Sequence, residues 1–169
     1  MPESILLAYA SRYGSTQEIA EAVTATLKEK GYSVDLKPAR EVRSLDQYNA
    51  VILGAPLYMF RWHKDAKRFL KRHRKVITQR PVAVFALGPF DDVEKDWQDV
   101  QSQIDKELAK FPWFVPKAVE VMGGAFDPQK LRFPFRFIPA LKYMPAKDIR
   151  DWDKIRAWAE DLPSLLNCE

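Results

Sequence analysis

The sequence predicts an α/β fold in which helices cover both faces of a parallel β-sheet. Apolar runs alternate with amphipathic helical patterns along the chain, as in consecutive βαβ units. Several of these runs are apolar almost throughout, which is typical of strands buried on both faces. The chain has 169 residues, of which 47% are hydrophobic, and this length supports one compact domain with a sizeable core. We therefore expect a single domain over residues 1–169.

The apolar runs and the helical patterns each predict specific elements. Five strands are expected, at Ser4–Tyr9, Ser33–Lys37, Ala50–Gly54, Val82–Leu87 and Ala118–Gly123. Four helices are expected between and after them, at Thr16–Lys30, Lys64–Lys75, Val93–Phe111 and Asp151–Leu166. The first helix has an apolar stripe made of Ile19, Ala20, Val23 and Leu27. Ser15 and Glu18 form a capping-box pattern at its start, and Gly31 ends it.

Residues 126–150, between the fifth strand and the last helix, interrupt this alternation. The segment is too long for an ordinary connection between a strand and a helix. Aromatic residues, prolines and basic residues alternate through it, so it resembles neither a flexible polar linker nor a plain helix. We expect an insertion with a role in binding.

Several classes of site are excluded by the motifs that the sequence lacks. Cys168 is the only cysteine, so no intramolecular disulfide can form. The two histidines, His63 and His73, make no zinc-binding pattern, and we expect no metal centre. The glycine-rich signatures of P-loop nucleotide hydrolases and of dinucleotide-binding folds are absent, and so is the nucleophile elbow of the α/β-hydrolases.

Positive charge is concentrated in two segments, although the net charge of the chain is only +4. Residues 56–80 contain nine basic residues and one acidic residue, Asp65, and residues 126–150 contain six basic and two acidic residues. This distribution favours anionic ligands, nucleic acid or an anionic lipid surface as partners. We expect no specific nucleic acid among them. No apolar run reaches membrane-spanning length, and the N-terminus lacks the basic start of an export signal. We expect a cytoplasmic protein, and contact with the inner face of the membrane stays open.

The segment after the first strand has the composition of a phosphate-binding loop. It reads Ser11, Arg12, Tyr13, Gly14, Ser15 and Thr16, and it leads directly into the first helix. The hydroxyl groups, a glycine able to adopt a left-handed conformation and the free N–H groups of a helix start together favour a phosphate monoester. The alternative interpretation is a capped turn that binds no ligand.

Two further loops at the carboxyl ends of strands carry apolar and aromatic residues. In open α/β sheets this edge is where ligands bind. The loops could hold a flat conjugated ring between them, although packing is an alternative role for each aromatic residue. The candidate ring contacts are Pro56, Leu57, Tyr58 and Met59 in one loop and Gly88, Pro89 and Phe90 in the other.

Together these residues resemble the flavodoxin-like FMN proteins over nearly the whole chain. Within that superfamily, the sequence is most similar to the quinone-dependent protoporphyrinogen dehydrogenases. The similarity lies in the 11–16 loop, in Gly54-Ala55-Pro56 with its aromatic continuation, in Gly123-Gly124-Ala125, in Asp151-Trp152 and in a late basic, aromatic insertion. The resemblance implies a three-layer sandwich whose five parallel strands lie in the order 2-1-3-4-5. It also implies FMN bound noncovalently, oxidation of a porphyrinogen through the flavin, and reoxidation by a membrane quinone.

The candidate substrate or membrane contacts are Arg61, Trp62, His63, Lys64, Arg132 and Arg136. Guanidinium groups suit substrate carboxylates. No catalytic residue is assigned, because the cofactor would supply the redox chemistry. One alternative is a flavodoxin-type electron carrier, which the basic segments disfavour, and another is a flavin-domain protein that acts as a membrane-surface binding module. Pairing of two copies into a homodimer also stays open.

Overall fold

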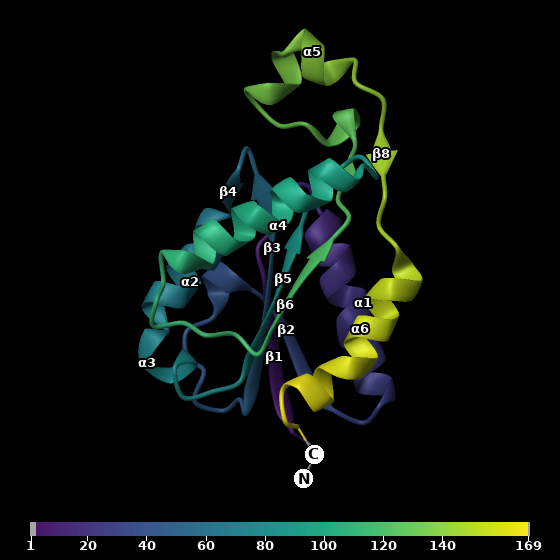
Figure 1. Cartoon of the computed structure of the whole chain (residues 1–169). Coiled ribbons are helices and arrows are strands. Elements are labelled where there is room, and N and C mark those ends of the chain that lie inside the picture. Colours follow the sequence, from purple (N-terminus) through teal and green to yellow (C-terminus); the bar gives the residue numbers. More distant parts are fainter. Residues whose placement is uncertain (1–2, 169) are drawn as a thin grey trace.

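The computed structural model describes residues 3–168, and a parallel sheet lies at its centre (Figure 1). The parallel strands lie in the order β2-β1-β3-β5-β6. Their bounds are β1 Ser4–Tyr9, β2 Ser33–Pro38, β3 Ala50–Tyr58, β5 Val82–Leu87 and β6 Ala118–Met122. A two-residue strand, β4 (Arg61–Trp62), pairs antiparallel with β3. The five parallel strands confirm the expected fold class and the order 2-1-3-4-5, because β4 lies outside that series.

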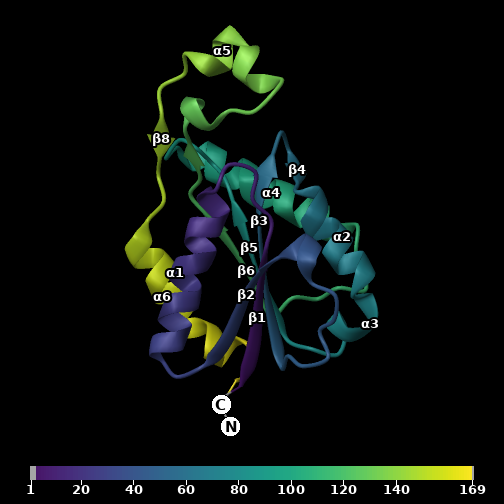
Figure 2. The same cartoon turned by 180° about the vertical axis from the view of Figure 1, so that it is seen from behind.

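Helices cover both faces of the sheet and form the outer layers of the sandwich. Helices α1 (Ser15–Glu29) and α6 (Trp152–Leu165) lie on one face, and α2 (Lys64–Arg72), α3 (Arg74–Ile77) and α4 (Glu94–Ala109) lie on the other (Figure 2). Alternate residues of each strand face opposite layers. In β1, Leu6 belongs to the core on the face of the sheet that α2 and α4 cover. Ile5 belongs to the core on the opposite face, which α1 and α6 cover. Both side chains are fully buried, which explains why the central residues of the strand, Ile5–Ala8, are all apolar.

Helix α1 begins differently from the expected capping box. Its N-cap is Gly14, with φ 93° in the left-handed region, and Ser15 is the first helical residue. The carboxylate of Glu18 forms an ion pair with Arg150 at 2.7 Å, so Ser15 and Glu18 do not cap each other. The prediction of that capping box is therefore wrong, although the predicted apolar stripe is buried.

The segment that follows the third predicted strand is a β-hairpin and not a loop. Strand β3 continues to Tyr58, and Leu57 and Tyr58 pair with Trp62 and Arg61 of β4. Met59 and Phe60 form the turn with φ values of 47° and 65°, which is the arrangement of a two-residue hairpin turn with both residues left-handed. The expected helix over Lys64–Lys75 is interrupted at His73, where α2 ends and α3 begins.

Residues 126–150 project beyond the carboxyl ends of the strands, at the opposite end of the molecule from both termini (Figure 1). Strands β7 (Ala125–Phe126) and β8 (Lys147–Asp148) pair antiparallel at the base of this segment. The 3-10 turns η2 (Pro128–Lys130) and η3 (Phe135–Phe137) and the short helix α5 (Pro139–Lys142) lie between them. A further turn, η1 (Ala39–Glu41), follows β2. Within residues 3–168, no helix combines the length and the apolar character needed to cross a bilayer.

Candidate cofactor site

The loop between β1 and α1 exposes the free backbone groups of a helix start. Gly14 N–H donates to Ser11 Oγ at 2.9 Å, which folds the loop back on itself. Because Gly14 is the N-cap, no side chain among residues 3–168 caps α1. The first N–H groups of a helix have no partner within the helix, and together with the helix dipole they attract an anion. Gly14 can occupy the N-cap position because a residue without a Cβ adopts the left-handed conformation without strain.

One buried hydroxyl group in the first turn of α1, Thr16 Oγ1, has no hydrogen-bond partner among the described residues. The buried phenol of Tyr13 lies instead beside the ring of Tyr58. Thr16 is only 1% exposed, so water does not compensate for the missing partner. A buried polar group without a partner destabilises a fold by about 1–3 kcal/mol, and such groups are therefore rare unless a ligand binds them. The Thr16 hydroxyl fits a phosphate held at the start of α1.

The same loop lines a cavity of about 490 Å³. Ser11 and Gly14 are part of its wall, and basic side chains reach it from three separate segments of the chain. These basic residues are Arg12 from the loop, Arg40 from η1, and Lys130 and Arg132 from the insertion. Among the described residues, Asp65 is the only acidic one in the wall. The positive field of this cavity complements a phosphate. A larger cavity of about 710 Å³, lined by Arg80 and Cys168 among others, lies at the opposite edge of the sheet and contains none of the predicted site residues.

Arg150 joins the end of the insertion to the start of α1, and the sequence did not indicate this role. Its side chain is 9% exposed and pairs with Glu18 at 2.7 Å and with Asp148 at 2.7 Å. The hydrogen bonds from Arg150 hold the pKa of Asp148 below its ordinary value. By pairing with Glu18, Arg150 neutralises the carboxylate in the first turn of α1, where an acidic group would otherwise repel a phosphate.

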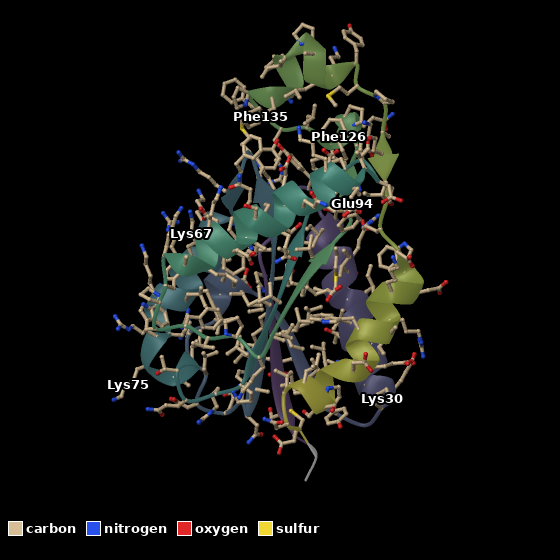
Figure 3. The ribbon with its side chains drawn as sticks, in the orientation of Figure 1. Lys30, Lys67, Lys75, Glu94, Phe126 and Phe135 are labelled. Carbon is tan, nitrogen blue, oxygen red and sulfur yellow. The ribbon has the colours of Figure 1, made fainter. Side chains whose placement is uncertain are left out.

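Tyr58, a predicted ring contact, lies against the phosphate loop and the insertion. Its ring centroid is 6.2 Å from that of Tyr13 and 6.3 Å from that of Phe135. The guanidinium carbon of Arg12 lies 4.8 Å from the Tyr58 centroid and 4.7 Å from the Phe135 centroid, as in cation–π contacts. Burial raises the pKa of Tyr58 to about 12, so its phenol stays neutral at physiological pH. Phe135 (Figure 3) was not among the predicted contacts, because nothing local marks it among the insertion's many aromatic residues.

The other predicted ring contacts occupy different environments. Leu57 is only 9% exposed and belongs to the core below α2 and α4, whereas Met59 is 73% exposed and Pro56 is half-buried. Gly88 N–H donates to the Met122 carbonyl at 3.0 Å.

The loop of residues 88–90, the second of the two loops predicted to contact a ring, touches the base of the insertion. The Pro89 carbonyl accepts from Gly124 N–H at 2.8 Å. Phe90 packs edge-to-face on Phe126, with centroids 6.1 Å apart. The structure therefore brings Tyr58 and the 11–16 loop together, and it joins the 88–90 loop to the insertion. That residues 56–59 and 88–90 hold a flat ring between them stays a prediction.

One predicted substrate or membrane contact is buried. Trp62 is 1% exposed, and its indole N–H donates to the Ala55 carbonyl at 3.2 Å. Its backbone N–H donates to Glu107 Oε2 at 3.3 Å. Because the side chain lies in the core, it cannot contact a substrate or a membrane, and that prediction is wrong.

The other predicted contacts are accessible to different degrees. Arg61, Lys64, Arg132 and Arg136 are exposed. His63 is half-buried at the start of α2, where its Nδ1 accepts from Asp65 N–H at 3.1 Å. Burial lowers the pKa of His63, so the neutral form that accepts this hydrogen bond is favoured.

The fold and the site define an open α/β protein with an anion site at the carboxyl end of its first strand. A family model described as "Flavodoxin domain" matches residues 6–149. The chain belongs to this flavodoxin-domain family. The family and the fold indicate FMN as the cofactor, and the free N–H groups of α1, the Thr16 hydroxyl and the basic cavity fit its phosphate.

Curated and solved relatives agree with this family. The chain is 24% identical over 174 aligned positions to a protein of Escherichia coli K12 named protoporphyrinogen IX dehydrogenase [quinone], and 96% of each chain is covered. Oxidised flavodoxin 1 from Bacillus cereus has a similar structure, with a TM-score of 0.61 at 15% identity and coverage of 96% of this chain and 98% of that one. Oxidised flavodoxin 2 from the same species gives a TM-score of 0.59 at 21% identity, with coverage of 95% and 98%.

Proposed function

We propose that this flavodoxin-domain protein is an FMN-dependent dehydrogenase that oxidises protoporphyrinogen IX and passes the electrons to a quinone. The observation that carries the proposal is the similarity to the dehydrogenase from Escherichia coli, which extends over 96% of both chains. The basic and aromatic insertion supports it, because it reaches the candidate cofactor site through Phe135. A flavodoxin-type electron carrier exchanges electrons through an exposed flavin edge, and it does not need an insertion that reaches the cofactor site.

In this proposal, bound FMN supplies the redox chemistry by accepting reducing equivalents from the substrate and releasing them to the acceptor. The chain supplies binding and orientation. The first N–H groups of α1 and the Thr16 hydroxyl hold the phosphate, and Tyr58 borders the ring. Arg132 and Arg136 are exposed on the insertion, where their guanidinium groups can pair with the carboxylates of a porphyrinogen.

A group of exposed apolar residues supports contact with a membrane, where a quinone would be found. This group lies in the β3–β4 turn and in the insertion, at the same end of the molecule (Figures 1 and 2), whereas other exposed apolar residues, such as Val115, lie outside it. The residues of the group are Met59, Phe60, Phe133, Phe137, Ile138, Tyr143 and Met144. Basic side chains lie among them in sequence, namely Arg61, Arg132, Arg136 and Lys142. Aromatic and basic residues in combination suit the interface of an anionic bilayer.

The test is an anaerobic assay of the FMN-loaded protein with protoporphyrinogen IX and a short-chain quinone. We expect porphyrin to form only when FMN and the quinone are both present. The same protein without FMN is the control for spontaneous oxidation. Tight FMN binding with reversible one-electron reduction but no porphyrin formation would contradict the dehydrogenase and favour the electron-carrier alternative.

A further inference from the structure

A second basic cavity, of about 370 Å³, adjoins the candidate cofactor cavity on the side of α2. Arg40 of η1 forms part of its wall, and Arg68, Lys71 and Arg72 of α2 form another part. Asp65 and Arg40 line both cavities, so the two hollows are neighbours with common walls. We call this second cavity the α2 groove.

The positive charge of the α2 groove is only partly balanced by the protein. Asp65 is the only acidic residue among the described residues of its wall, and this carboxylate lies 3.9 Å from the guanidinium of Arg68. The guanidinium of Arg40 lies 3.9 Å from the carboxylate of Glu41, which is outside the wall. Lys71 and Arg72 are exposed, and neither forms an ion pair with any residue between 3 and 168. Arg68, Lys71 and Arg72 are spaced so that they share one face of α2. Like charges gathered around a concavity create a positive potential that favours a ligand with several negative charges.

The shape and the lining of the groove indicate which kind of polyanion fits. A flat bilayer contacts protruding surfaces, and the exposed apolar residues that suit a lipid interface lie in the insertion and the β3–β4 turn. Binding of single-stranded nucleic acid without sequence preference uses exposed aromatic side chains on which the bases stack. Phe69, the only aromatic residue among the described residues of the groove, is 2% exposed. An acidic polypeptide needs neither a protruding apolar surface nor exposed aromatic side chains. Its carboxylates can pair with arginine and lysine side chains along a concave surface.

We propose that the α2 groove binds an acidic segment of a partner protein. This interaction surface goes beyond the redox function and does not depend on the identity of the substrate. Because Arg40 and Asp65 belong to both cavities, a segment bound in the groove also lies beside the wall of the cofactor cavity.

The test measures binding of a fluorescein-labelled, glutamate-rich dodecapeptide to the FMN-loaded protein by fluorescence anisotropy at low salt. The groove variant combines Lys71→Gln and Arg72→Gln. The matched control combines Lys75→Gln and Lys95→Gln, which removes the same charge from exposed positions outside both cavities. Lys75 lies on the same basic side of the molecule as Lys67 (Figure 3). We expect the groove variant to bind about tenfold more weakly and the control to stay within about twofold of the original chain.

Three outcomes would overturn the proposal. The peptide could fail to bind the original protein, or the two variants could lose the same affinity, which would indicate attraction to net charge alone. Anionic vesicles or single-stranded DNA could also depend on Lys71 and Arg72 while the peptide does not. FMN affinity, measured on the same samples, should be equal in all three proteins. A loss of peptide binding is therefore distinguishable from a failure of the cofactor site.

Discussion

The backbone N–H of Trp62 donates to the buried carboxylate of Glu107 across 3.3 Å, and this contact ties the β3–β4 hairpin to α4. Glu107 is 3% exposed and also pairs with Lys67 of α2 at 3.3 Å and with Lys110. Burial alone would raise the pKa of this carboxyl, but the hydrogen bonds from Lys110, Lys67 and the Trp62 N–H outweigh it and lower the pKa. Glu107 thus positions the hairpin that carries Tyr58.

Replacing Glu107 by alanine should destabilise the fold by about 3 kcal/mol, because it leaves the Trp62 N–H and the ammonium of Lys67 without their partner. Urea unfolding followed by tryptophan fluorescence measures the change. Asp105→Ala, at an exposed position of the same helix, should change the free energy of unfolding by less than about 0.5 kcal/mol. Equal effects of the two substitutions would show that Glu107 does not hold the hairpin.

Replacing Thr16 by valine should weaken FMN binding by about tenfold, because it removes a hydroxyl that we assign to the phosphate. The same substitution should leave the apo-protein equally stable or stabilise it, since the hydroxyl is buried without a partner. Thr24→Val is the matched control, because Thr24 Oγ1 is also buried and unpartnered but lies further along α1. We expect this control to bind FMN normally in a flavin-fluorescence titration. An unchanged affinity of the Thr16 variant would remove Thr16 from the phosphate site.

Acidification should destabilise the protein through its two histidines. Burial lowers the pKa of both His63 and His73 in the folded chain. A group with a lowered folded-state pKa stabilises the fold fully above its unfolded value of about 6.5, and that contribution is lost as the pH falls through the folded value. The free energy of unfolding should therefore decrease as the pH falls below about 6.5. His73→Phe keeps a ring beside Phe69 and should reduce this dependence, so an unchanged pH profile would contradict the account.

Replacing both Arg132 and Arg136 by glutamate should abolish sedimentation with anionic vesicles if the insertion contacts the membrane. Each basic residue near an anionic surface contributes about 1 kcal/mol to binding, and reversal of its charge adds repulsion. Lys95→Glu with Lys154→Glu makes the same charge change at exposed positions of α4 and α6 and should retain more of the binding. Equal sedimentation of the two double variants would exclude the insertion as the contact.

The sheet could be predicted from the sequence because its signals are local. β1 and β5 are apolar almost throughout and are covered on both faces. The structure gives both strands the predicted bounds, Ser4–Tyr9 and Val82–Leu87. The phosphate loop was recognisable for the same reason, since its hydroxyls and Gly14 are consecutive in the chain. Asp151, which was predicted to begin the last helix, caps α6 by accepting from Lys154 N–H at 3.1 Å.

The features that the sequence did not indicate depend on distant contacts. The β3–β4 hairpin turns at Met59 and Phe60, which are not the residues that normally mark such a turn. Arg150 reaches Glu18 across 132 positions of sequence. Phe135 of the insertion contacts Tyr58 of β3, which lies far from it in the sequence. No periodicity or local spacing encodes such contacts.

The most direct test of the phosphate site compares the affinities of the apo-protein for FMN and for riboflavin by isothermal titration calorimetry. The two ligands differ only in the phosphate group, which we assign to the start of α1 and the basic cavity around Arg12. We predict that FMN binds at least about a hundredfold more tightly, because several charge-assisted hydrogen bonds are made only to the phosphate. Equal affinities, or no binding of FMN, would contradict the account.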